Sequence, residues 1–165
     1  MKAALAVLLL SVSMSATAQT ADDLYKQACG PLQAKFVVEQ TKGQPPTAPE
    51  PGKALVFFIQ KGNGPVFTTR VGLDGAWAGV LQNDSYIFAS VAPGEHHACA
   101  ATLNRKRPEA ELVNFTVEAG KTYYYLLRGI AAYESSGTME FGPADRDEAR
   151  YLIASDPQSN ATPAP

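Results

Sequence analysis

The sequence predicts a mainly β protein, a single antiparallel β-sandwich with a short N-terminal helix and a short C-terminal helix. Three observations predict this class. Short apolar or alternating stretches follow one another from Lys53 to Leu127, turn residues such as Asp74-Gly75 separate them, and no long amphipathic helix stands between them. Strands at this spacing, without crossover helices, are typical of antiparallel sandwiches.

The first 18 residues have the three parts of a secretory signal peptide. Lys2 is the only charge before an apolar run from Ala3 to Leu10, and Ala16-Thr17-Ala18 offers the small residues at which signal peptidase cleaves. The apolar run is too short to span a bilayer. We therefore expect residues 1–18 to be removed after Ala18, giving a periplasmic or secreted protein without a transmembrane segment.

The composition of the remaining chain suits one domain of modest acidity. Removal of 18 from 165 residues leaves 147, enough for one hydrophobic core. Because Lys2 is lost with the signal peptide, 13 of the 14 basic side chains remain against 16 acidic ones. This balance argues against a nucleic-acid partner. The basic run Arg105-Lys106-Arg107 is predicted to be a solvated loop tip.

Residues 19–52 are predicted to form an arm that packs on the domain. The stretch from Ala21 to Ala28 has acidic residues in its first turn, which favours a short helix. The stretch from Gln33 to Glu39 alternates as a strand does. Residues 41–52 include four prolines, which remove backbone donors and predict a semi-extended connector.

The β domain with its C-terminal helix is predicted to span residues 53–155. Its first strand, Ala54 to Ile59, is a continuous apolar run, as expected for a strand buried on both faces. Turn residues such as Asp74-Gly75 separate the strands that follow. These strands are expected at Val66–Leu73, Trp77–Leu81, Ser85–Val91, Glu95–Thr102, Leu112–Glu118 and Lys121–Leu127, the last two forming a hairpin.

The C-terminal part is predicted to be one helix followed by a tail. Residues 145–154 begin with an aspartate that can cap the helix, and a glutamate follows three residues later. Tyr151 and Leu152 are expected to pack on the sheet, and Arg150 to point outward. Residues 156–165 are rich in proline, serine and asparagine and are predicted to be disordered.

Five motifs stand in a fixed order between Pro51 and Tyr125. They are Pro51-Gly52-Lys53-Ala54-Leu55-Val56-Phe57, Val71-Gly72-Leu73-Asp74-Gly75 with Gly79, Tyr86, Val91-Ala92-Pro93-Gly94-Glu95-His96, and Ala119-Gly120-Lys121-Thr122-Tyr123-Tyr124. Together they resemble DUF2846, a bacterial domain of unknown function found in exported proteins and lipoproteins. The resemblance implies a transthyretin-like or PEGA-like sandwich and supplies no catalytic residues. Many members are lipoproteins, whereas this chain lacks a cysteine at the expected cleavage site.

Cys29 and Cys99 are the only cysteines, and they are predicted to form a disulfide bond. Both remain after removal of the signal peptide, and both reach a compartment in which thiol pairs tend to oxidise. The bond would close a loop of about 70 residues, worth about 4 kcal/mol in the chain-entropy model. A redox-active pair is not expected, because no C-x-x-C motif is present.

His96, His97 and Cys99 are the candidate metal ligands, since imidazole and thiolate bind zinc or copper. Residues two apart in a strand share a face, so His97 and Cys99 can point together while His96 points the other way. Two ligands are too few for a closed site. We therefore favour one inward and one solvent-facing histidine, with no cofactor, and keep a metal-binding or redox protein as the alternative.

The sequence offers no recognisable arrangement of nucleophile, base and orienting acid, so an enzyme is not expected. Trp77, Tyr86 and Tyr124 are the candidate ligand-facing aromatics, although their spacing on strands favours core packing. Alternation places Tyr124 on the sheet face opposite Tyr123 and Tyr125. The favoured function is an exported, non-enzymatic binding or structural module of the bacterial cell envelope, with an envelope protein or a glycan as partner.

Overall fold

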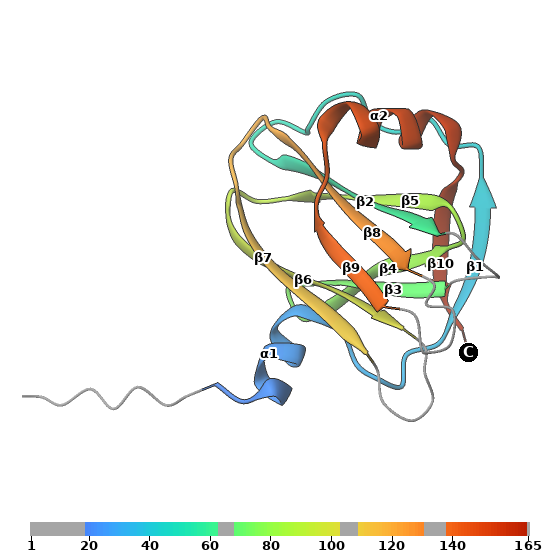
Figure 1. Ribbon diagram of the computed structural model, residues 1–165. Coiled ribbons are helices and arrows are strands. Elements are labelled where there is room, and N and C mark those ends of the chain that lie inside the picture. The colour runs from blue at the N-terminus through green and yellow to red at the C-terminus, as the bar shows by residue number, and fades with distance from the viewer. Residues whose placement is uncertain (1–18, 63–67, 103–108, 131–137, 165) are drawn as a thin grey trace, which may run out of the picture.

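The structure is a computed structural model that describes residues 19–62, 68–102, 109–130 and 138–164 (Figure 1). The predicted signal peptide and the basic run at 105–107 lie outside the described residues. Within the described ranges the fold is mainly β, as predicted, with strands in two sheets and a helix near each end. In chain order the elements are α1 (Ala21–Ala28), β1 (Phe36–Thr41), β2 (Ala54–Gly62), β3 (Thr68–Leu73), β4 (Ala76–Gln82), β5 (Ser85–Val91), β6 (Gly94–Thr102), β7 (Ala110–Val117), β8 (Thr122–Ile130), β9 (Thr138–Pro143), α2 (Arg146–Ser155) and β10 (Gln158–Pro163).

Both helices begin at the caps that their sequences provide. The Thr20 hydroxyl accepts a hydrogen bond from the Asp23 amide, and the Asp23 carboxylate accepts one from the Thr20 amide, which forms a capping box at α1. Asp145, as predicted, accepts hydrogen bonds from the amides of Asp147 and Glu148 at the start of α2. The ends of the two helices are therefore set by local side chains.

The strands form a six-stranded sheet in the order β1-β10-β5-β2-β8-β9 and a four-stranded sheet in the order β4-β3-β6-β7. The predicted hairpin of β3 and β4 is present, and its turn residues Asp74 and Gly75 have φ values of 51° and 80°. The purely antiparallel arrangement is wrong, because β2 runs parallel to β8, and β10 runs parallel to β5.

The predicted hairpin over 112–127 is also wrong, because its two strands belong to different sheets. β7 pairs with β6, and β8 pairs with β2 and β9. The turn at Gly120, which has a φ of 75°, donates its amide hydrogen to the Lys53 carbonyl at 2.8 Å. The turn lies where the chain crosses from one sheet to the other. Its hydrogen bond to Lys53, just before β2, places the start of β8 beside the start of β2, and the two strands run parallel.

Strand β2 is buried on both faces, as its continuous apolar run predicted. Val56 and Phe58 pack in a core cluster with residues of β3, β4 and β6 from the other sheet. Leu55 and Phe57 point the opposite way, into a second cluster that includes Leu152 of α2. The six-stranded sheet is therefore covered by the second sheet on one face and by α2 on the other.

The packing of α2 confirms part of the prediction for this helix. Ala149 and Leu152 are buried against the sheet, three residues apart on one helix face. Tyr151 does not pack on the sheet, because its position next to Leu152 turns it to solvent, where it is 71% exposed.

The predicted disordered tail is wrong, because residues 158–163 form β10. This strand pairs with β1 over six residues and meets β5 where Gln158 lies opposite Tyr86 (Figure 1). Ser159 is 3% exposed and donates from its hydroxyl to the Ser85 hydroxyl at 3.1 Å. The C-terminal strand thus links the N-terminal arm to the main sheet. Strand β9 was not predicted either.

Candidate functional site

The predicted disulfide between Cys29 and Cys99 is present, with 5.6 Å between the two Cα atoms. Both cysteines are buried, and the bond fastens the end of α1 to β6. Gly72 of β3 lies opposite Cys99, and a Cβ at this position would stand 2.7 Å from the Cα of Cys29. The absence of a side chain at Gly72 therefore permits the arm to approach the sheet.

Trp77 packs against the N-terminal arm, beside the buried disulfide. Its indole Nε1 donates to the Pro31 carbonyl at 2.8 Å, and the Arg70 guanidinium lies 5.4 Å from the ring centroid. A Cβ at Gly30 would come within 2.5 Å of the indole ring. The contacts of Trp77 with Pro31 and Gly30 therefore help to fix the arm on the sheet.

His96 and His97 point to opposite faces of β6, as predicted. The His96 ring is buried, with its Nδ1 2.7 Å from Asp74 Oδ2 and its Nε2 2.8 Å from the Ala92 carbonyl. The Nε2 of His97 lies 2.8 Å from the side-chain nitrogen of Gln27 on α1.

A metal site at this strand lacks its ligands. The sulfur of Cys99 is bonded to Cys29, and both ring nitrogens of His96 have acceptors of their own. Across the described ranges, no group of three or more histidine, cysteine, aspartate or glutamate side chains can hold a metal ion. In the alternative function, His96, His97 and Cys99 bind a metal; the disulfide leaves Cys99 without the thiolate that this role requires.

The surroundings of His96 favour its charged form. Burial opposes protonation, but the hydrogen bonds to Asp74 and to the Ala92 carbonyl outweigh it, so the pKa of His96 is raised above 6.5. An imidazole can donate to two acceptors at once only when both nitrogens carry a proton.

We expect this histidine to make the protein more stable in mild acid. Since the pKa of His96 is higher in the folded chain, its contribution is complete below pH 6.5 and is lost as the pH rises through the folded-state pKa. Urea unfolding between pH 5 and 9 should show the free energy of unfolding falling over this interval. The same measurement on His96→Gln should give a flatter profile; equal slopes would contradict the assignment.

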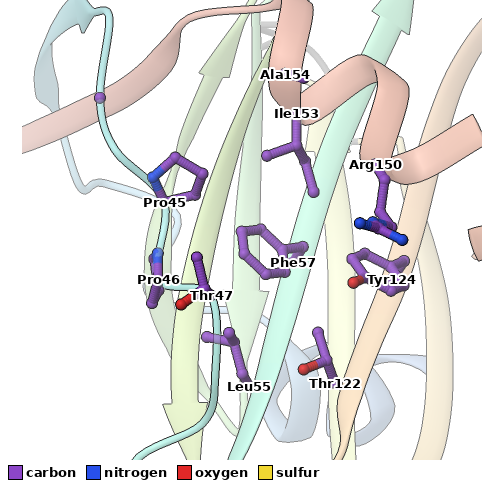
Figure 2. A pocket seen from close by; sticks show the side chains of 11 residues that line it. Pro45, Pro46, Thr47, Leu55, Phe57, Thr122, Tyr124, Arg150, Ile153 and Ala154 are labelled. Atoms are coloured by element: carbon purple, nitrogen blue, oxygen red, sulfur yellow. The ribbon is translucent and has the colours of Figure 1, made fainter. Parts of the chain in front are cut away.

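A groove on the outer face of the six-stranded sheet is the candidate ligand site. It lies between the proline-rich connector, strands β2 and β8, and helix α2 (Figure 2). Its volume is about 470 Å³, within the range of sites that bind small ligands. The lining residues are Gly43, Pro45, Pro46, Thr47, Leu55, Phe57, Thr122, Tyr124, Arg150, Ile153 and Ala154.

The floor of the groove is apolar and aromatic. The rings of Phe57 and Tyr124 are stacked, with centroids 5.6 Å apart and an interplanar angle of 17°. Figure 2 shows Ile153 above Phe57, with Pro45 at the side. Leu55 and Phe57 are almost fully buried, whereas Tyr124 and Ile153 are partly exposed and offer apolar surface that a ligand can reach.

Of the three aromatic candidates from the sequence, only Tyr124 lines this groove. Tyr124 and its two neighbours face opposite sides of the sheet, as alternation predicted. Tyr86 is 1% exposed and packs beside Phe57, and burial raises the pKa of its phenol. Tyr86 therefore packs beside the floor residue Phe57, in the cluster covered by α2.

Among the described residues, Arg150 is the only charged one that lines the groove. Arg150 is exposed, as the sequence predicted, and Figure 2 shows its side chain pointing toward the Tyr124 ring. Within the described part of the chain no carboxylate lies within ion-pair distance of it, whereas Arg128 is paired with Glu148 at 2.5 Å. Arg150 therefore brings an uncompensated positive charge to an apolar groove.

The connector that forms one wall is held at its two ends. The Gly43 amide donates to the Thr41 carbonyl at 2.9 Å, and Glu50 accepts from the Ser90 hydroxyl at 3.1 Å and pairs with Lys53 at 2.7 Å. Among the described residues, no hydrogen bond joins 44–49 to the rest of the chain. The backbone carbonyls of residues 44–49 therefore have no hydrogen-bond partner among the described residues.

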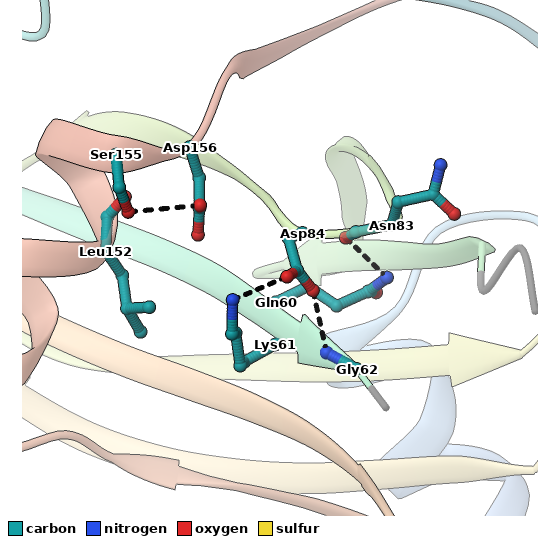
Figure 3. A network of polar contacts seen from close by, with 8 residues as sticks. All are labelled: Gln60, Lys61, Gly62, Asn83, Asp84, Leu152, Ser155 and Asp156. Carbon is teal, nitrogen blue, oxygen red and sulfur yellow. Dashed lines mark hydrogen bonds and ion pairs between the residues drawn. The ribbon is translucent and has the colours of Figure 1, made fainter. Parts of the chain in front are cut away.

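A second polar cluster lies where β2 ends, and it is structural. Lys61 pairs with Asp84 at 2.5 Å, and Asp84 also accepts from the Gly62 amide at 2.9 Å (Figure 3). The hydrogen bond to Asp84 and the nearby charge of Asp156 raise the pKa of Lys61. These contacts of Asp84 with Lys61 and the Gly62 amide link the end of β2 to the turn before β5.

No family model, curated protein or solved structure matches the chain. The likeness to DUF2846 therefore stays a prediction. No described helix has both the length and the apolar character needed to cross a membrane.

Proposed function

We propose that the chain is an exported, non-enzymatic binding module of the bacterial cell envelope that holds its ligand in the groove beside Tyr124. The groove itself carries this proposal, since it combines a volume of about 470 Å³ with an apolar floor and one unpaired cation. The disulfide supports export, because such bonds persist in oxidising compartments. The two packed sheets and the resemblance to DUF2846 support a transthyretin-like sandwich as the scaffold.

The chemistry of the lining favours binding over catalysis. It includes no histidine, cysteine, aspartate or glutamate, and the hydroxyls of Thr47 and Thr122 have no base beside them within the lining. A hydrolytic site needs a nucleophile activated by a base. Stacked aromatics, prolines and one arginine are instead suited to hold a ligand in a defined orientation.

A bulky side chain at Ala154 should abolish binding without unfolding the protein. Ala154 is exposed and lines the groove, so Ala154→Trp fills the space that the ligand needs. The probes are soluble peptidoglycan fragments and, separately, a pool of short peptides, each titrated into the isotope-labelled mature chain. One series should shift the NMR signals of Thr122, Tyr124 and Ile153 in the unsubstituted chain and leave those of Ala154→Trp in place.

Tyr151→Trp is the matched control for this variant. Tyr151 lies on the same helix, is exposed and does not line the groove, so binding should persist within about twofold. If neither probe series shifts the groove signals, the groove is not the ligand site.

Export predicts where the mature chain begins. The protein recovered from the periplasm or the medium should start at Gln19, because the small side chains of Ala16 and Ala18 fit the peptidase. Ala18→Lys should block processing and leave the longer form with the membrane fraction, as N-terminal sequencing and mass spectrometry would reveal. A mature form that retains residues 1–18 would contradict export by this route.

A further inference from the structure

We propose that the ligand of this groove is the carboxyl-terminal end of a peptide with an apolar last residue; this inference rests on the proposed function and names the class of ligand. Three features of the groove, its charge, its apolar floor and its unbonded wall, carry the inference together.

The charge of the groove calls for an anion. Its lining contains one cation, Arg150, and no acid. Arg146 precedes Arg150 by one helical turn, so two like charges stand on the same side of α2, an unfavourable arrangement that an anion would relieve. Within the described ranges neither guanidinium has a carboxylate partner. A guanidinium binds a carboxylate through two parallel hydrogen bonds, which makes a terminal carboxylate a well-matched ligand group.

The surface next to Arg150 calls for an apolar group attached to that anion. Tyr124, toward which Arg150 points, stacks on Phe57, and Ile153 covers the same side of the groove (Figure 2). An anion without an apolar body would leave this surface in contact with water. A last residue such as leucine or phenylalanine places its side chain on the floor while its carboxylate reaches Arg150.

The connector argues for a peptide as the source of the carboxylate. The backbone of residues 44–49 makes no hydrogen bond within the described chain, and Pro45, Pro46 and Thr47 line one wall of the groove. An extended peptide can donate its amide hydrogens to unpaired backbone carbonyls, a mode of recognition that a small free acid cannot use. The hydroxyls of Thr47 and Thr122 add donors and acceptors beside this wall.

The test compares the free carboxylate with its amide on the intact mature chain. The probes are N-acetylated tripeptides ending in Leu, Phe or Tyr, each prepared as the free acid and as the carboxyl-terminal amide, with 3-phenylpropionate as the small acid. At least one free acid should shift the groove signals in NMR titrations. The affinity of its amide should be lower by about tenfold or more, as expected for loss of a charge-assisted hydrogen bond. The affinity of the free acid should fall with added salt.

Arg150→Gln should remove the preference for the acid, so that the free acid and its amide bind with the same affinity. Arg146→Gln is the matched control; it lies on the same helix outside the lining and should weaken the acid less than threefold. This split distinguishes recognition of the carboxylate from a general change in charge or folding.

The other possible results of these titrations each overturn one part of the proposal. Equal binding of acid and amide at the groove overturns carboxylate recognition and leaves the proposed binding function standing. Binding of 3-phenylpropionate as tight as that of the peptides overturns the peptide source. If no tripeptide binds but peptidoglycan fragments do, the inference is wrong and the proposed function holds; if nothing binds at the groove, both are wrong.

Discussion

Replacing either cysteine of the Cys29–Cys99 bond with alanine should lower the free energy of unfolding by about 4 kcal/mol. The bond closes a loop with a sequence separation of 70 residues, and the entropy that this closure removes from the unfolded chain accounts for the estimate. Both sulfurs lie in a buried cluster with Ala28, so the lost packing adds to the effect. The arm with α1 should lose hydrogen-exchange protection first.

Urea unfolding of both single variants and the double variant provides the measurement. Because one bond is lost in each case, Cys29→Ala, Cys99→Ala and the double variant should be destabilised to nearly the same extent. Losses that add up in the double variant would show that the two side chains act separately. A loss below about 1 kcal/mol in each variant would show that the bond contributes little.

Ending the chain after Pro157 should cost a comparable amount, because it removes all of β10. β1 pairs with this strand over six residues, and Ser159 donates to Ser85 in the interior. At a net value of about 1 kcal/mol for each hydrogen bond of such a pairing, the free energy of unfolding should fall by about 3 to 6 kcal/mol. Denaturant titration and amide exchange at β1 would measure the change.

A shorter truncation separates the strand from the end of the chain. Ending the chain after Pro163 keeps the whole pairing of β1 and removes the hydrogen bond from the Ala164 amide to the Lys35 carbonyl. This variant should stay within about 1 kcal/mol of the full chain. If the truncation after Pro157 is equally mild, β10 is not part of the stable fold.

The features that were predicted correctly depend on local signals. The α1 and α2 helices begin at capping residues, the β3–β4 hairpin turns at Asp74-Gly75, and the only two cysteines pair. Each of these signals is contained in a few neighbouring residues or in a simple count. These features can therefore be predicted from the sequence without knowledge of the tertiary contacts.

The features that were missed depend on partners far away in the chain. Residues 158–163 are polar and read as a tail, and they become a strand only because β1 and β5 supply partners on both sides. The groove joins a wall at 45–47, a floor at Phe57 and Tyr124, and Arg150 on α2. No local pattern could show that the connector lies beside this face, so that the exposed Arg150 comes to line a groove.

The position of β10 also determines when the fold can be completed. Since β1 pairs with β10, the first of the described strands has its partner after all the other described strands in the chain. The cysteine of the arm, by contrast, meets its partner as soon as β6 is available. We expect the arm to be tethered first and its strand to be added to the sheet only after β10 has been synthesised, so that a polypeptide that still lacks β10 stays incompletely folded.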